Sequence, residues 1–226
     1  MLSNYGLIFD VDGVIADTES VNARASIQAF QDVLGLQGVK RPDFKEGLGR
    51  GSAEYVRAAA RLHGVELSNE QAGMLTEARQ QNFLAMLDKD PLPPFPGVLE
   101  LICSAIADEA FHVAIATSST RAKSGAVLRS AGIPYDGMPW ITGDDISRKK
   151  PDPEVFLTAA KRLDLRPEQC VVVEDAPNGV AAAASGGFKC IAVTNSAPAD
   201  ELSDADLVVS SLLEVTLITL RDLLER

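Results

Sequence analysis

Two aspartates separated by one residue, Asp10 and Asp12, follow a short apolar run near the start of the chain and precede Gly13. In an extended segment both side chains point the same way, because side chains along a strand repeat their direction every second residue. Two neighbouring carboxylates repel each other, so the pair indicates a bound cation or a shared proton. The alternative is a turn or a helix cap, since aspartate is common at both.

A run of hydroxyl residues forms the second group that could do chemistry. Thr117 and Ser118 open the sequence TSST, which follows another apolar run. Hydroxyls and free backbone N–H groups at the start of a helix can bind an anion. The same residues are equally typical of an ordinary helix N-cap.

The third and fourth groups are a lysine beside prolines and a second acidic pair. Lys150 lies in the sequence KKPDP, whose prolines restrict the backbone, and it could supply positive charge to an oxyanion. A solvated basic turn is the more common role of such a lysine. Glu174 and Asp175 follow the apolar run CVVV and precede PNG, so the pair could bind a metal or cap the next helix.

The elements that must position these four groups are short β-favouring segments. Five apolar runs occur, at residues 7–9, 113–116, 171–173, 191–193 and 207–209. They show no polar alternation, and helical patterns such as 153–163 and 211–224 separate several of them, which is typical of a parallel sheet covered on both faces. We therefore expect an α/β fold with a doubly wound parallel sheet, in which the ends of the strands form the ligand site.

Residues 18–93 lack strand-like runs and read as successive helices at 20–34, 52–63 and 68–87. The third helix opens with Ser68 and, three residues later, Gln71, a pattern typical of a capping box. A proline-rich stretch then ends the segment, because prolines remove backbone donors. We expect an all-helical domain of residues 18–93 inserted into a core domain of residues 1–17 and 94–226.

Composition excludes several classes of protein. The chain has 226 residues, is 46% hydrophobic and carries a net charge of −11, so it can form a core, and it is poorly suited to bind nucleic acid or anionic membranes. We find no apolar stretch near the ~18 residues that a membrane span needs, and no signal-peptide pattern. Three cysteines without metal-ligand spacing favour a reducing compartment, and we expect a cytoplasmic protein.

Taken together, an acidic pair, hydroxyls, a lysine and a second acidic pair at successive strand ends favour metal-assisted phosphoryl transfer. Four motifs carry them: FDVDGVIADTES at 9–20, IATSST at 115–120, KKPDP at 149–153 and VVVEDAPNG at 171–179. With these motifs, the sequence resembles the haloacid dehalogenase-like hydrolase superfamily, in the branch of β-phosphoglucomutase and many small-molecule phosphatases. The resemblance spans almost the whole chain and identifies the helical insertion as a cap domain.

The resemblance implies a role for each acidic residue. Asp10 would be the nucleophile that forms an aspartyl-phosphate, and Asp12 the general acid and then the general base. Mg²⁺ would be the cofactor, held by Asp10, by the backbone carbonyl of Asp12 and by Asp175. Glu174 would interact with the waters that magnesium retains.

The resemblance also implies which groups bind the phosphoryl oxygens. Thr117 and Lys150 would contact them, assisted by the backbone N–H of Ser118. Arg50, in a glycine-rich loop of the cap, could bind another part of the substrate. The partner would then be a small phosphorylated metabolite, and the cap's movement is compatible with a monomer or weak oligomer.

The choice between phosphatase and phosphomutase depends on the cap. A mutase is expected to carry a histidine base shortly after the first motif and an arginine before a cap helix. Here the histidine position holds Asn22, and the arginine position falls near Ala53, three residues after Arg50. We therefore expect an Mg²⁺-dependent phosphatase of small phosphomonoesters, with sugar phosphates as one candidate class, and keep a phosphomutase as the alternative.

Two further classes share parts of this pattern. A receiver domain also uses acidic residues, a hydroxyl and a lysine on an α/β sheet, but it has no need of a helical insertion of this length. A non-catalytic phosphate-binding module remains open as well, although all four groups are intact. Because Asp12 is present, the resemblance favours phosphohydrolases over the dehalogenating members of the superfamily.

Overall fold

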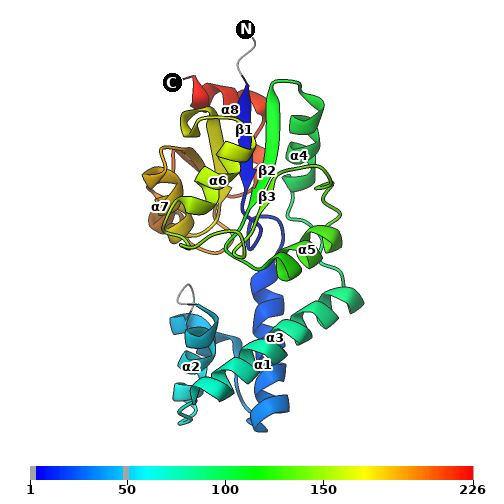
Figure 1. Cartoon of the computed structure of the whole chain (residues 1–226), viewed down its shortest axis with the longest axis vertical. Helices are drawn as coiled ribbons and strands as arrows, with labels where there is room; N and C mark the ends of the chain where they lie inside the picture. The colour runs from blue at the N-terminus through cyan, green and yellow to red at the C-terminus, as the bar shows by residue number, and fades with distance from the viewer. Residues whose placement is uncertain (1–3, 48–50, 226) are drawn as a thin grey trace. The chain divides into compact units, whose positions relative to one another are not determined.

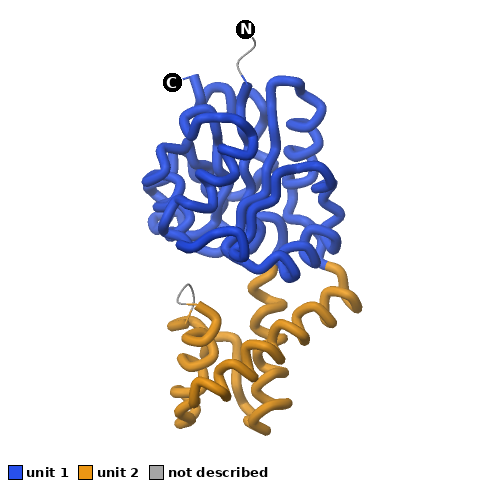
Figure 2. Tube along the Cα trace, in the orientation of Figure 1, with its two compact units in different colours: residues 1–17, 92–226 blue, residues 18–91 orange. Residues whose placement is uncertain are grey.

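The computed structural model describes residues 4–47 and 51–225, which fold as two compact units (Figures 1 and 2). The units are Met1–Asp17 with Leu92–Arg226, called here the sheet unit, and Thr18–Pro91, called here the helical unit. The sequence placed the second boundary after Pro93. Leu92 belongs to the sheet unit, where its backbone N–H donates a hydrogen bond of 2.5 Å to the Ser130 hydroxyl. Arg50 lies outside the described residues.

The sheet unit is built on six parallel strands in the order β3-β2-β1-β4-β5-β6, which confirms the expected fold class. The strands are β1 Tyr5–Phe9, β2 Phe111–Ala116, β3 Trp140–Ile141, β4 Cys170–Glu174, β5 Lys189–Val193 and β6 Leu207–Val209. All five expected strands are present. The sequence missed β3, because a two-residue edge strand is too short to produce a pattern. From β1 the chain adds β2 and β3 on one side of the sheet, and it then adds β4, β5 and β6 on the other side. The switch point therefore lies between β1 and β4, and open α/β sheets bind their ligands at such a point.

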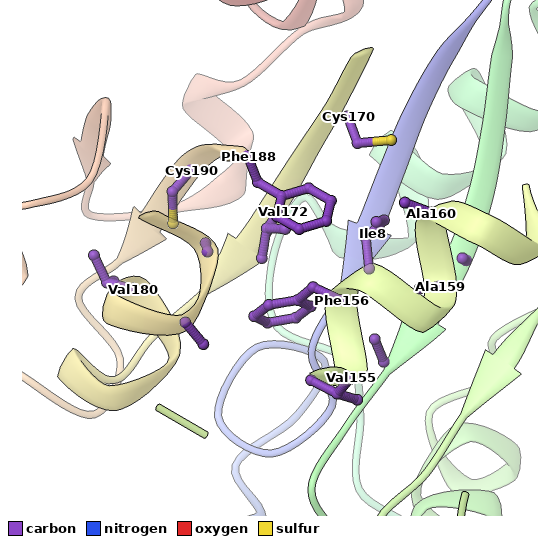
Figure 3. Close-up of a cluster of buried hydrophobic side chains, with 14 of the residues drawn as sticks. Ile8, Val155, Phe156, Ala159, Ala160, Cys170, Val172, Val180, Phe188 and Cys190 are labelled. Carbon is purple, nitrogen blue, oxygen red and sulfur yellow. The ribbon is translucent and has the colours of Figure 1, made fainter. Parts of the chain in front are cut away.

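Five helices belong to this unit: α4 Val98–Ala107, α5 Arg121–Ser130, α6 Glu154–Arg162, α7 Pro177–Ser185 and α8 Leu217–Leu224. Two of them, α6 and α7, cover one face of the sheet (Figure 3). There Ile8 and Val172 pack in one buried cluster with Phe156 of α6 and Val180 of α7. Each fully buried side chain of this size contributes about 1.5–3 kcal/mol. On the other face, α4 contacts β2, α8 contacts β4, and the two helices contact each other.

The expected helix over residues 211–224 is wrong. The structure has a 3₁₀ turn at Leu212–Glu214, extended backbone at Val215 and then α8. Ser211 and Thr216 each form a capping box, so each hydroxyl binds backbone N–H groups of a new helical segment. Such competition between side chain and backbone breaks a helix that apolar periodicity alone would continue.

The helical unit consists of α1 Thr18–Leu34, a 3₁₀ segment Arg41–Gly47, α2 Ser52–Leu62 and α3 Asn69–Lys89. Its core joins Phe30 of α1, Phe44 of the 3₁₀ segment and Tyr55 of α2, whose ring stacks on Phe44 at 4.9 Å. The expected capping box is present, because Ser68 Oγ accepts from the Gln71 backbone and the Gln71 side chain accepts from the Ser68 backbone. Across residues 4–47 and 51–225, no helix has the length and apolarity to cross a membrane.

The 3₁₀ segment is fixed by a pair between Asp43 and His63, 2.7 Å apart, and this pair makes a testable prediction. The hydrogen bond with His63 is the main cause that lowers the pKa of Asp43. A lowered pKa means that the carboxylate stabilises the fold above its ordinary pKa of about 3.9, and that this stability is lost as the pH falls through the folded-state pKa. We expect Asp43→Asn to reduce the free energy of unfolding by up to about 1 kcal/mol at pH 7.

Urea unfolding at pH 7 and at stepwise lower pH measures this difference. The loss in Asp43→Asn should shrink toward zero as the pH falls below about 4. Glu46→Gln is the matched control, because Glu46 is an exposed carboxylate of the same 3₁₀ segment. A loss in Asp43→Asn that stays constant with pH would contradict the proposed origin of the effect.

Candidate active site

Three of the four predicted groups follow adjacent strands of the sheet. Asp10 follows β1, Thr117 follows β2, and Glu174 ends β4. Because β1 lies between β2 and β4 in register, with Phe9 opposite Ile115 and Val173, their carboxyl ends lie side by side. Asp10 and Glu174 are more than 160 residues apart in sequence, yet they meet at the switch point between β1 and β4. Thr117 lies next to them at the end of β2.

Lys150 reaches this point from the loop before α6 and joins two of the acidic groups. Its ammonium donates hydrogen bonds of 2.5 Å both to Asp10 Oδ1 and to Glu174 Oε1. The three side chains are only 6%, 7% and 2% exposed, respectively. Burial alone would lower the pKa of Lys150, but the two carboxylates raise it above its ordinary value. The two carboxylates therefore stabilise the charged form of Lys150.

The acidic residues outnumber this lysine. Burial raises the pKa of Asp10 to about 7, with Lys150 opposing the shift and the charges of Glu174 and Asp12 adding to it. Burial, followed by the charges of Glu174 and Asp10, also raises the pKa of Asp175 well above its ordinary value. One lysine thus faces three buried carboxyl groups whose ionised forms repel one another, and a bound cation would stabilise those ionised forms.

The oxygen atoms of this cluster suit a hard cation, which prefers oxygen ligands. Asp10 and Asp175 supply carboxylates beside the backbone of Asp12, whereas Glu174 is occupied by Lys150 and by two backbone N–H groups. Within residues 4–47 and 51–225, no three carboxylate, imidazole or thiol groups form a ready-made metal cage. Magnesium is commonly held by one or two carboxylates together with substrate phosphate and water, so this set suits it.

Gly13 allows the two acidic segments to approach each other. Its φ of 77° lies in the left-handed region, and a Cβ at this position would be 1.8 Å from Asp175 Oδ2. Asn195 donates 2.8 Å to the Gly13 carbonyl, and the Ser196 hydroxyl donates to Asp175 Oδ2. The sequence reasoning missed Asn195 and Ser196. The polar run TNS directly after the expected strand at 191–193 is the signal that could have identified them.

Asp12 is held by two residues of the TSSTRAK segment that the sequence reasoning did not assign. Ser119 Oγ donates 2.5 Å to Asp12 Oδ2, and Lys123 Nζ lies 2.7 Å from Asp12 Oδ1. Ser119 also donates its backbone N–H to Thr117 Oγ1 at 3.1 Å. The hydroxyl group next to β2 is thereby linked to the second aspartate of the pair.

Ser118 is placed in this loop by a close backbone contact. A Cβ on Gly143 would be 2.3 Å from the Ser118 carbonyl, and the Gly143 N–H donates 2.7 Å to the Ser119 carbonyl. The Ser118 hydroxyl is buried and has no hydrogen-bond partner among the described residues. Because buried hydroxyls are nearly always paired, this orphan group supports a loop that is completed by a bound ligand.

Glu174 also has a structural role, although it does not cap α7, whose N-cap Ala176 has no side-chain hydrogen bond. Its Oε2 accepts from the backbone N–H groups of Asp175 at 2.8 Å and Ala176 at 3.1 Å, next to the start of α7. Gly179 provides the space for this side chain, since a Cβ there would be 1.9 Å from Glu174 Oε1. Glu174 thus connects the fold of α7 with the position of Lys150.

We expect Gly179→Ala to displace Glu174 and to lower the free energy of unfolding by about 1–3 kcal/mol, the usual cost of overpacking a core. The variant should also lose activity, because Lys150 loses one of its two carboxylates. Gly73→Ala is the control, since a Cβ at Gly73 in α3 meets nothing within 4 Å and should be neutral or slightly stabilising. Urea unfolding of both variants tests the contrast, and equal stability of the two would contradict it.

The helical unit has a cavity of about 620 Å³ between α2 and α3. Arg57, Thr76 and Gln80 are among its lining residues, and none of the predicted catalytic residues is. The lining of the cavity therefore contains no residue of the acidic cluster.

Comparison with known proteins places the chain among hydrolases. A profile of haloacid dehalogenase-like hydrolases matches residues 6–187. The putative phosphatase YhcW of Bacillus subtilis is 32% identical over 220 residues, which cover 96% of each chain. The Arabidopsis thaliana protein SUPPRESSOR OF QUENCHING 1, chloroplastic, is 34% identical over 207 residues, 88% of this chain. The chain spans only 19% of the length of that relative.

A similar solved structure is CbbY from Rhodobacter sphaeroides in complex with xylulose-(1,5)bisphosphate. It is 28% identical, its TM-score is 0.83, and the match covers 96% of this chain and 99% of that chain. The similarity therefore extends through the sheet unit and the helical unit alike.

Proposed function

Because the chain belongs to the haloacid dehalogenase-like hydrolase family and is an enzyme of its phosphatase type, we propose that it hydrolyses a small phosphomonoester through a phosphoaspartate on Asp10. The observation that carries the proposal is the placement of Asp10 at the switch point, buried against Lys150 and next to Asp12 and Asp175. A receiver-like module has no need of a helical unit as long as Thr18–Pro91.

The reaction has two steps, each with a defined path for its proton. In the first, an Asp10 oxygen attacks phosphorus, the bond from phosphorus to the substrate oxygen breaks, and Asp12 gives its proton to the departing oxygen. In the second, Asp12 takes a proton from water, the water oxygen attacks phosphorus, and Asp10 leaves as a carboxylate with release of inorganic phosphate. Two easier displacements replace one difficult hydrolysis.

Lys150 and the loop after β2 stabilise the transferred group. Lys150 is fixed by Asp10 and Glu174, so its charge is oriented before substrate binds. Thr117 accepts a hydrogen bond from Ser119 and keeps its own hydroxyl hydrogen for a phosphoryl oxygen. The Ser118 N–H and its unpaired hydroxyl are additional donors in the same loop. Groups aimed in advance at developing charge lower the barrier most.

Mg²⁺ fits this site, with Asp10, Asp175 and the backbone carbonyl of Asp12 as the oxygen ligands. When bound, the ion neutralises charge between the carboxylates and the phosphoryl group. Ser196 orients Asp175 through its hydrogen bond, and Glu174 holds Lys150 rather than the ion. Burial and mutual repulsion of these carboxylates, which raise the pKa of Asp10 and of Asp175, support this assignment.

The helical unit of residues 18–91 is proposed as a cap that selects the substrate, with a sugar phosphate as the substrate class. The support is the bisphosphate sugar bound by CbbY, whose fold matches along the whole chain. Hydrolysis is favoured over phosphomutase activity because Asn22 stands where the mutase pattern needs a histidine base, and an amide does not accept a proton at neutral pH.

Phosphorus NMR of the purified protein with Mg²⁺ and a mixed panel of sugar phosphates tests this function. We expect inorganic phosphate to grow at the expense of one class of ester, and to stop when EDTA is added in excess. Asp10→Asn is the blank. Conversion of one ester into another without free phosphate would establish a mutase instead. Activity unchanged by EDTA would contradict the proposed requirement for Mg²⁺.

A further inference from the structure

The carboxylate of Asp12 is clamped by the segment that begins α5. Ser119 Oγ donates 2.5 Å to Asp12 Oδ2, and Lys123 Nζ lies 2.7 Å from Asp12 Oδ1. Lys123 Nζ also lies 3.4 Å from Ser119 Oγ, so the three groups form a closed triangle. The side chains of Lys123 and Asp12 are 20% and 29% exposed, which leaves the carboxylate accessible to a small molecule.

The local fold fixes both members of this clamp. The Ser119 backbone is held at its N–H by Thr117 Oγ1 and at its carbonyl by Gly143, which directs the side chain toward Asp12. Lys123 is in the first turn of α5, where the Thr120 side chain accepts from the Lys123 N–H at 3.4 Å. The loop that contains Thr117 therefore also fixes the positions of Ser119 and Lys123 around Asp12.

We propose that Ser119 and Lys123 are positioning residues that orient Asp12 as the base for water in the second step, hydrolysis of the phosphoaspartate. This inference rests on the proposed phosphatase function. Asp12 is the residue that takes a proton from water in that step, and its side chain is 29% exposed, so water can reach it. Its direction is set by the two donors, and such supporting contacts are typically worth 10–100-fold in activity.

The two steps can be separated with p-nitrophenyl phosphate as the probe. Its leaving group departs without being protonated, so the first step does not depend on Asp12. With this ester, kcat/KM reports formation of the phosphoenzyme and kcat reports its hydrolysis once that step is slowest. We expect Lys123→Met and Ser119→Ala to lower kcat by about 10–100-fold and to leave kcat/KM within about threefold of the wild type.

A slow second step also has a direct signature in rapid mixing. The Lys123→Met variant should release about one equivalent of p-nitrophenol per enzyme in a burst, followed by slow turnover. Lys123→Arg should restore most of kcat, because it keeps a charged donor for Asp12. In an Asp12→Asn background, Lys123→Met should cause no further loss, since a residue that acts only through Asp12 is not additive with it.

Lys161→Met is the matched control, because Lys161 is an exposed lysine near the end of α6 in the same unit. Its kinetics should equal those of the wild type. Equal loss of kcat and kcat/KM in Lys123→Met, with no burst, would overturn the positioning role. A wild-type protein that does not hydrolyse p-nitrophenyl phosphate or any ester of the panel would overturn the proposed function itself.

Discussion

Asp10→Asn is expected to lose at least about a thousandfold in kcat while keeping its fold. The amide is not a nucleophile toward phosphorus, so no phosphoaspartate forms and both steps fail. The fold should persist because the Asn carbonyl oxygen can still accept the hydrogen bond that Lys150 now donates to Asp10. Steady-state release of phosphate and acid-quench labelling of the phosphoenzyme both measure the loss.

Asp136→Asn provides the control for this substitution, since Asp136 is an exposed carboxylate in the same unit and belongs to none of the four groups. It should retain wild-type activity. Phosphoenzyme that still forms in Asp10→Asn would transfer the role of nucleophile to another residue, and Asp12 would then be the first to test. Circular dichroism and the urea midpoint distinguish a chemical loss from unfolding.

The sheet could be predicted because each long strand contains an uninterrupted run of buried apolar residues. Runs such as 171–173 carry this signal in their residues alone. The two-residue edge strand β3 carries no such signal, and its pairing with β2 depends on the neighbouring strand. The break at Val215 was also hidden, because apolar periodicity continues through it while the hydroxyls of Ser211 and Thr216 start new helical segments.

The candidate site was predictable to the extent that its residues directly follow strands. Asp10, Thr117 and Glu174 could be placed this way, and the resemblance to the family added their expected roles. The pairing of side chains across the sheet was not predictable, because it depends on strand order and loop geometry. Ser119 and Lys123 therefore became visible only when the structure placed them against Asp12.

Charge balance links the stability of the sheet unit to its chemistry. Asp10, Glu174 and Asp175 are all nearly buried, and Lys150 is the cation that the structure places among them. Folding therefore brings carboxyl groups together at the point where the proposed phosphate ester would bind. The lysine offsets part of this repulsion in the free protein, and a divalent cation would offset the remainder during the reaction.

Lys150→Met should accordingly be both inactive and unstable. The substitution leaves Asp10 and Glu174 buried without their shared partner, and breaking a buried ion pair in this way costs about 3–5 kcal/mol. Loss of a charge aimed at the phosphoryl oxygens should lower kcat by at least about a hundredfold. Urea unfolding at pH 7 in EDTA measures the first effect, and phosphate release with Mg²⁺ measures the second.

Lys149→Met is the neighbouring control, because Lys149 is exposed and should change stability by no more than about 0.5 kcal/mol. Lys150→Arg separates the two effects: it keeps the positive charge between the carboxylates and should recover stability, while its longer planar head displaces the charge from the phosphoryl group and leaves activity low. If Lys150→Met unfolded at the same urea concentration as the wild type, Lys150 would not be the cation that holds Asp10 and Glu174 together. Both the assigned geometry and the role of Lys150 in binding phosphate would then be wrong.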